Sequence, residues 1–267
     1  MLVHACYVWY SQLDTAILNK NYDLLRQLLS SRQYHLHYLD PQKNQSWWES
    51  ISKKADLEAM LIICESMDIE QLPPHMSMLH WCVREDFVDK VEGILRNYPK
   101  MVNLKHPDKS IPLHFVRSIS MLDILVRYGS NLSAKDDKHY TPLHEIVMAI
   151  RNANEINVML HYLMYTDRHF WEELDDQQEF MLQIVDVIFR YHPQPYVQLS
   201  KMMSIFIDQN PTDADFFQKL MVSAPRTKEC DSCVSLQHFI RETFSIKKRV
   251  YESQMNESFN QFLILNR

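Results

Sequence analysis

Few side chains in this chain have the types and spacing that could perform chemistry. His144 and Glu145 begin the HExxH pattern, in which two histidines four residues apart on one helical face bind zinc. Position 148 is occupied by Met148, so the second zinc ligand is missing. We therefore interpret the pair as part of another motif and predict no metal site there.

Cysteine offers a second route to chemistry. Cys230 and Cys233 form a C-x-x-C pair, which suits half of a zinc site or a redox pair. A zinc site needs two more ligands, and only His238 lies nearby in the sequence. Cys64 and Cys82 fall on apolar helical faces, where cysteine usually acts as a small buried hydrophobic residue. The five cysteines are odd in number and irregular in spacing, which favours a reducing compartment.

Two further features bear on catalysis. The acidic stretch 171–179, WEELDDQQE, could hold a cation or a basic partner, or form a solvated loop and a helix start. Gly93 and Gly129 are the only two glycines, whereas phosphate-binding loops need several. We therefore expect no cofactor, and a protein that is not an enzyme. An enzyme in the divergent region 150–230 is the alternative, and no motif supports it.

Charge and hydropathy limit the classes of partner that we expect. The 267 residues include 28 basic and 34 acidic side chains, for a net charge of −6, and the basic ones are scattered except at 247–249. Nucleic acid is therefore not expected as the principal partner. No apolar run approaches the roughly 20 residues that span a bilayer, and the first residues lack a secretory signal. We predict a soluble intracellular protein, cytoplasmic or nuclear, without a membrane partner.

The elements that must position these residues have helical spacing throughout. From Phe87 to Leu95 the apolar residues fall at i, i+1, i+4, i+7 and i+8, which predicts an amphipathic helix, and Pro99 follows as a stop. Similar stripes occur in 24–29, 57–64 and 182–189. Strand alternation does not recur, so we predict an all-α fold.

One short motif repeats along the chain. The stretch 141–144 reads TPLH, 111–114 reads IPLH, and 78–80 reads MLH, so the final histidines are 30 and 34 residues apart. In the unit that begins at 111, Pro112 suits the first turn of a helix, and Gly129 suits the left-handed residue that closes a second helix.

This pattern resembles the ankyrin repeat, a turn and two helices of about 33 residues with a T-P-L-H signature. The resemblance is clearest over 75–149 and implies an ankyrin-repeat solenoid over 1–228, with divergent repeats on both sides. It also implies that Thr141 and the histidines at 80, 114 and 144 tie the turns to neighbouring backbone. His139 and Tyr140 stand where the family usually has glycine.

The C-terminal segment carries a second resemblance. Ser235 suits a helix N-cap, and the apolar residues that follow it form one helical stripe. The string S-L-Q-H-x-x-R, directly after such an array, resembles the SOCS box of the ankyrin repeat and SOCS box family. The resemblance implies a helical box over 229–267 that binds Elongin C, with Elongin B, through Leu236, Phe239, Ile240 and Phe244. It places Leu263 and Leu265 in the cullin-binding stretch, where the prolines of the family are missing, as is its cysteine at position 240.

The sequence therefore predicts a protein-interaction module, with two interpretations open. The first is a substrate receptor of an Elongin-cullin-RING ubiquitin ligase, and the second is a scaffold or inhibitor whose C-terminal helices only cap the solenoid. The target is expected at the loop tips, which are not committed to the core and carry mixed charge without a preferred sign. The candidates are His106, Asp108, Lys109, Asp136, Asp137, Lys138, His139 and Tyr140, with Trp47, Trp48 and Trp81 as aromatic anchors or core residues.

Overall fold

The computed structural model describes residues 2–30, 51, 53–66, 78–174, 176–209, 214–223, 238–243, 245–246, 249–250 and 252–253. Every regular element in these ranges is an α-helix or a 3-10 helix, and no strand occurs in them. The all-α prediction is therefore confirmed. The chain divides into two compact units, Met1–Glu145 and Ile146–Arg267. The predicted boundary between 228 and 229 lies outside the described residues.

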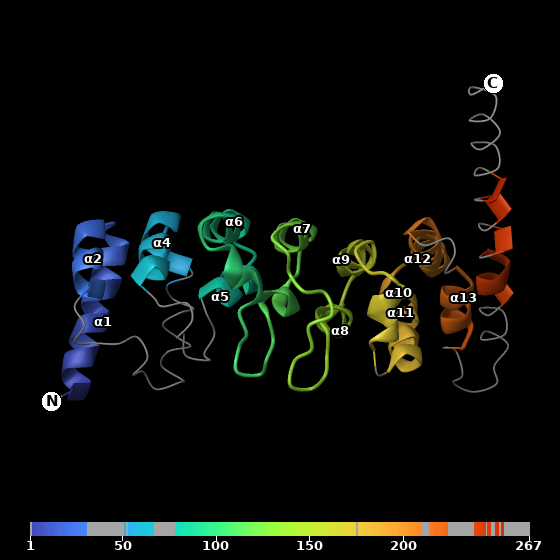
Figure 1. The fold of residues 1–267 in the computed structure, drawn as a ribbon, viewed down its shortest axis with the longest axis horizontal. Coiled ribbons are helices and arrows are strands. Elements are labelled where there is room, and N and C mark those ends of the chain that lie inside the picture. The colour runs from blue at the N-terminus through green and yellow to red at the C-terminus, as the bar shows by residue number, and fades with distance from the viewer. Residues whose placement is uncertain are drawn as a thin grey trace, which may run out of the picture. The chain divides into compact units, whose positions relative to one another are not determined.

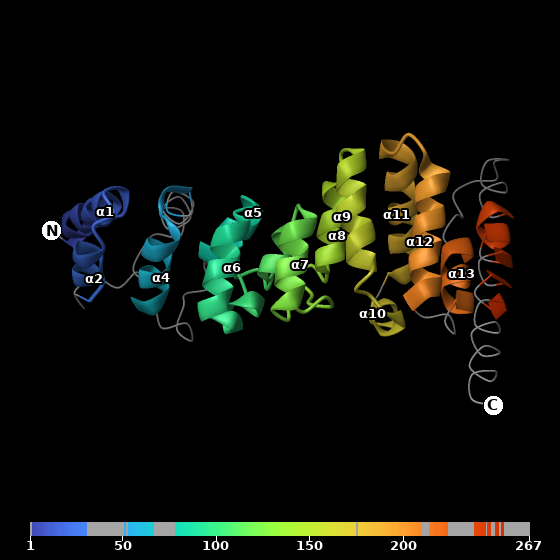
Figure 2. The ribbon, with the colours of Figure 1, turned by 90° about the horizontal axis from the view of Figure 1, so that it is seen from above.

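Unit 1 contains one long helix, α1, followed by shorter ones. Its elements are α1 (Leu2–Leu18), α2 (Tyr22–Ser30), α4 (Leu57–Ser66), α5 (Met78–Arg84), α6 (Val88–Asn97), the 3-10 helices η3 (Pro99–Asn103) and η4 (Pro112–Phe115), and α7 (Ile119–Arg127). Helices α2, α4, α6 and α7 pack side by side in chain order (Figures 1 and 2). Helix α1 packs on α2, α5 packs on α6 and η4, and η4 also contacts α7. Unit 1 is thus built from two layers of helices.

Three helices of unit 1 end in the same way. Lys20, Asp86 and Gly129 follow α1, α5 and α7 with positive φ angles of 53°, 57° and 83°. The N–H of each bonds to the carbonyl three residues back, and the next N–H bonds to the carbonyl five residues back. The prediction for Gly129 is confirmed. Lys20 and Asp86 hold the same conformation at a cost of roughly 1–2 kcal/mol each, because a Cβ crowds the carbonyl.

The unit that begins at Ile111 is shortened at its first helix. Pro112 occupies the first position, as predicted, but the helix is a four-residue 3-10 turn rather than an α-helix. Ser118 then caps α7, its hydroxyl accepting from the N–H of Met121 at 3.2 Å. Only Val116, Arg117 and the cap Ser118 separate the two elements. The chain must therefore turn before a full α-helical turn can be completed.

Unit 2 has an aromatic core. After α8 (Pro142–Ala149), which crosses the boundary, come α9 (Ala153–Leu163), α10 (Arg168–Glu172), α11 (Gln177–Tyr191), α12 (Pro195–Gln209) and α13 (Ala214–Ser223). Trp171 is fully buried, with its ring centroid 5.7 Å from Phe206, and Phe206 stacks on Phe217 at 4.3 Å. The acidic stretch thus begins inside the core, while Glu172 and Glu173 are exposed and pair with Arg168 and His169.

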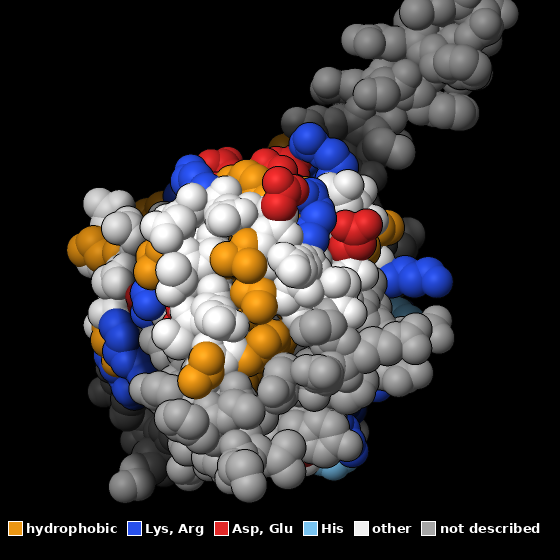
Figure 3. Space-filling model, turned by 90° about the vertical axis from the view of Figure 1, so that its left-hand side faces the viewer, with side chains coloured by type: hydrophobic (Ala, Val, Ile, Leu, Met, Phe, Trp, Pro, Cys, Tyr) orange, Lys and Arg blue, Asp and Glu red, His pale blue; other side chains and the backbone are white. Residues whose placement is uncertain are grey.

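The side of the molecule that carries α1 and α2 is shown in Figure 3. Hydrophobic and uncharged side chains occupy the middle of the described surface, and charged side chains lie toward its edge. Val8 and Leu18 on α1 are 44% and 58% exposed. In the part of the chain described by the structure, no helix has the length and apolar character needed to cross a membrane.

Gly93 lies on α6 at its contact with α4. A Cβ at this position would lie 2.4 Å and 2.6 Å from the two methyl carbons of Leu57, the first residue of α4. The missing side chain therefore leaves the space that the end of the Leu57 side chain occupies against α6. At this position glycine costs about 1 kcal/mol of helix propensity relative to alanine.

We expect Gly93→Ala to lower the thermal midpoint of unfolding, because overpacking of about 1–3 kcal/mol outweighs the gain in helix propensity. In a Leu57→Ala background the clash is removed, and the same substitution should raise the midpoint. Thermal unfolding followed by circular dichroism of the four proteins measures both effects. A stabilising Gly93→Ala in the wild-type background would contradict the packing argument.

Candidate functional site

Two connections in unit 1 have the same geometry. We define the first tip as residues 106–110 and the second tip as residues 136–140. Their end residues are joined by the bonds from the N–H of His106 to the Ser110 carbonyl at 2.8 Å and from the N–H of Asp136 to the Tyr140 carbonyl at 3.0 Å. The fourth residue of each tip, Lys109 or His139, has a positive φ of 63° or 67°. The tips are thus equivalent at an offset of 30 residues.

A buried histidine follows each tip and holds its end. His114 Nδ1 lies 3.1 Å from the N–H of Ile111, and His144 Nδ1 lies 3.1 Å from the N–H of Thr141. The Thr141 hydroxyl lies 2.8 Å from the same His144 nitrogen. Each Nδ1 accepts a backbone hydrogen bond, so the ring proton is assigned to Nε2. The prediction that these two histidines tie the turns to backbone is confirmed, whereas the Thr141 hydroxyl meets the His144 ring rather than backbone.

The histidine of one unit also holds the tip of the next. His114 Nε2 lies 3.2 Å from the carbonyl oxygen of Tyr140, the last residue of the second tip. His80 occupies the corresponding position before the first tip and is completely buried. Burial above all, together with the charge of His106, lowers the pKa of His80 to about 3, whereas hydrogen bonding with the Ser110 backbone raises it. Ser110 ends the first tip as Tyr140 ends the second.

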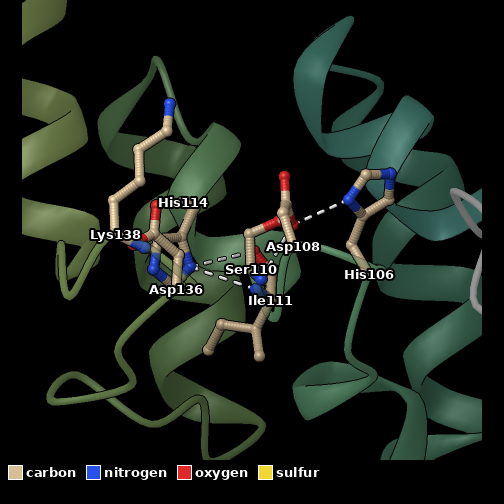
Figure 4. A network of polar contacts seen from close by, with 7 residues as sticks. All are labelled: His106, Asp108, Ser110, Ile111, His114, Asp136 and Lys138. Carbon is tan, nitrogen blue, oxygen red and sulfur yellow. Dashed lines mark hydrogen bonds and ion pairs between the residues drawn. The ribbon is translucent and has the colours of Figure 1, made fainter.

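The acidic side chains of the tips bond inward. One oxygen of Asp108 accepts from the Ser110 N–H at 3.0 Å and its hydroxyl at 2.6 Å, and lies 2.7 Å from His106 Nδ1 (Figure 4). Burial raises the pKa of Asp108, but these hydrogen bonds outweigh it and the pKa is lowered. One oxygen of Asp136 accepts the N–H groups of Lys138 and Tyr140, each at 2.8 Å. Both carboxylates therefore shape the tips.

The tips are joined to each other and present a small exposed set. The N–H of Asp137 donates to the carbonyl of Asp108 at 2.7 Å. Among the eight predicted target-binding residues, Lys109, Asp137, Lys138 and His139 are exposed. The other four, His106, Asp108, Asp136 and Tyr140, are partly buried, and the Tyr140 ring stacks on His144 at 5.5 Å.

Sequence reasoning missed an asparagine brace beside the tips. The Asn103 amide nitrogen donates to the Gly129 carbonyl at 2.9 Å, and its oxygen accepts from the N–H of Asn131 at 2.8 Å. This side chain joins the end of η3 to the end of α7. Asn103 and Gly129 are 26 residues apart, and no local sequence pattern predicts a hydrogen bond between them.

The structure describes some of the predicted aromatic anchors and C-terminal binding residues, and others lie outside the described residues. Trp81 is buried in α5, so the core interpretation applies to it. Residues 238–243 form a helix in which Ile240 is 0% exposed and Phe239 lies 4.9 Å from the ring of Tyr196. Outside the residues whose side chains are described lie Trp47, Trp48, Leu236, Phe244, Leu263, Leu265, Cys230 and Cys233.

Cys64 and Cys82 are buried and unreactive. Burial raises the pKa of the thiols of Cys64 and Cys82 to about 12, so neither is a nucleophile near neutral pH. The residues described by the structure contain no cluster of three histidine, cysteine or acidic side chains that could hold a metal ion.

Comparison of the chain with protein-family models, with curated proteins and with solved structures finds no match. The function is therefore argued from the geometry of the tips and from the sequence.

We predict that acid destabilises unit 1 through His80. The ring is neutral when folded, with a pKa of about 3, and titrates near the usual value when unfolded. Protons therefore bind the unfolded chain first, and stability is lost as the pH falls through about 6.5 toward 3. Acidification from about pH 7 to 5 should cost about 2 kcal/mol.

The check is thermal unfolding at both pH values. His80→Gln should reduce the pH dependence, and the control His139→Gln, at an exposed position, should leave it unchanged. Equal pH dependence in wild type and His80→Gln would show that His80 is not the acid-sensitive group.

Proposed function

We propose that this protein is an ankyrin-repeat protein that binds another protein through its two tips. The observation that carries the proposal is the repetition of one hydrogen-bond pattern at an offset of 30 residues, with a buried histidine after each tip. The motif at 111–114 and 141–144 that resembles the ankyrin signature is the motif that supplies these bonds.

The form of the tips supports recognition rather than catalysis. Their backbone is held by internal hydrogen bonds and by the link between Asp137 and Asp108, so little conformational entropy is lost when a partner binds. Their exposed side chains are free of any core role. In this proposal the protein performs no chemistry and uses no cofactor, and it acts inside the cell, in the cytoplasm or nucleus.

Partner capture tests this proposal. We expect the double variant Asp137→Ala, Lys138→Ala to lose a specific partner in quantitative affinity purification from cell lysate, by roughly tenfold. A matched control, Lys201→Ala with Asp208→Ala, removes one exposed charge of each sign from α12 and should retain that partner. Both variants should keep the wild-type thermal midpoint. A partner profile identical in all three proteins would contradict binding through the tips.

A second proposal concerns the C-terminal segment. The string S-L-Q-H-F-I-R at 235–241 supports a SOCS-box-like role, in which the protein is the substrate receptor of an Elongin-cullin ubiquitin ligase. Arg241 and Glu242 face solvent on the described helix. Ile240, which stands where the family inserts a cysteine into Elongin C, is fully buried in this chain.

The burial of Ile240 supports the competing scaffold interpretation. A helix that buries Ile240 and sets Phe239 against Tyr196 covers apolar surface of α12, as a cap of a helical array does. Elongin C would then reach only side chains that the cap leaves uncovered. The two proposals differ in whether this segment binds a second protein.

A pull-down with purified Elongins B and C separates the two proposals. The receptor proposal predicts binding by the wild type, at least about tenfold weaker binding by Leu236→Asp, and unchanged binding by the exposed control Glu242→Lys. Ile240→Asp is uninformative, because a charge at a buried position disrupts the helix itself. No binding by the folded wild type would leave the capping role.

A further inference from the structure

We infer that the two tips recognise an acidic protein segment. This inference rests on the proposed protein-binding function and names the class of partner that the tips fit. It depends on which charged groups of the tips face outward, a property that the mixed composition of these loops does not reveal.

The exposed charges of the two connections are mostly positive. Over 104–110 and 135–140 the exposed charged residues are Lys105, Lys109, Lys138 and Asp137. The side chain of Asp108, a partly buried residue, is also 43% exposed, so three cations face two anions. Lys109 sits at the left-handed position of the first tip, and His139 is exposed at the equivalent position of the second. Lys135 is partly buried. An incoming segment therefore meets ammonium groups at both tips.

The other two carboxylates are held by the tips themselves. Asp108 is engaged by Ser110 and His106, and Asp136 by the backbone of Lys138 and Tyr140. Figure 4 shows the Lys138 side chain extending away from this network, while its backbone N–H bonds to Asp136. The acidic residues thus fix the turns, and the lysines are presented to a partner.

The two sets of lysines form one surface. The bond from the Asp137 N–H to the Asp108 carbonyl, at 2.7 Å, fixes the tips side by side. Because the backbones of the two tips are joined, one extended chain can meet lysines of both tips. Electrostatic attraction of this kind raises association rates and favours partners of the opposite sign.

A protein segment fits better than nucleic acid. Tight binding to a duplex commonly uses about 6–10 phosphate contacts, and these tips offer three exposed lysines on a chain of net charge −6. No exposed phenylalanine, tyrosine or tryptophan ring lies on either tip, because Tyr140 is partly buried and stacked on His144. A stretch of aspartate and glutamate matches the small size and the sign of the surface.

The test is fluorescence anisotropy of the full chain with a labelled peptide of about 12 alternating glutamate and serine residues, which spans roughly 40 Å when extended. We expect saturable binding that weakens between about 50 mM and 300 mM salt. A glutamine–serine peptide of equal length should bind at least about tenfold more weakly.

Matched variants make the test specific. Lys109→Glu with Lys138→Glu should weaken peptide binding at least about tenfold. The control is Lys201→Glu with Lys219→Glu, which changes the net charge equally at exposed sites of α12 and α13. This control should weaken peptide binding by less than about twofold. Equal loss in both pairs, no discrimination between the peptides, or tighter binding to a DNA duplex would overturn the inference.

Failure of this inference is distinguishable from failure of the proposed function. If the acidic peptide does not bind but partner capture still depends on Asp137 and Lys138, the partner class is wrong and binding through the tips stands. If partner capture is also independent of these residues, both are wrong.

Discussion

The arrangement of unit 1 depends on a buried neutral imidazole that makes two backbone hydrogen bonds. His114 accepts the Ile111 N–H on one side and reaches the Tyr140 carbonyl on the other. A loop that leaves a helical layer exposes polar backbone groups that secondary structure does not pair. The imidazole satisfies two of them from within the core, so it joins the start of η4 to the tip that precedes α8. Successive loops are thereby held at a fixed distance.

Much of unit 1 could be predicted from the sequence because its signals are local. The stripe from Phe87 to Leu95 and the stop at Pro99 predicted the two ends of α6 to within about two residues. Gly129 predicted the end of α7. The 3-10 form of η4 was missed, because it results from the short distance to the Ser118 cap rather than from the propensity of Pro112 and its neighbours.

The position of the loop tips was predictable from the sequence, but which of their charged side chains face solvent was not. The eight residues chosen at the loop tips lie where they were expected, yet half of them serve the loops themselves. Asp108 and Asp136 are indistinguishable from Asp137 by residue type, and only hydrogen bonds to specific backbone groups separate them. In unit 2, Trp171 was missed as a core residue because it begins an acidic run, and Phe206 and Phe217, two of the rings around it, are distant in sequence.

The closing bond of each tip is made by main-chain atoms only. His106 and Ser110 close the first tip, and Asp136 and Tyr140 close the second, through N–H and carbonyl groups that every such residue possesses. The side chains between them, at positions 107, 109, 137 and 139, contribute no side-chain hydrogen bond to this closure. These positions can therefore be randomised to create binders of new specificity while the helices beneath keep their sequence. At 109 and 139, glycine and asparagine belong in such a library because they tolerate the left-handed backbone.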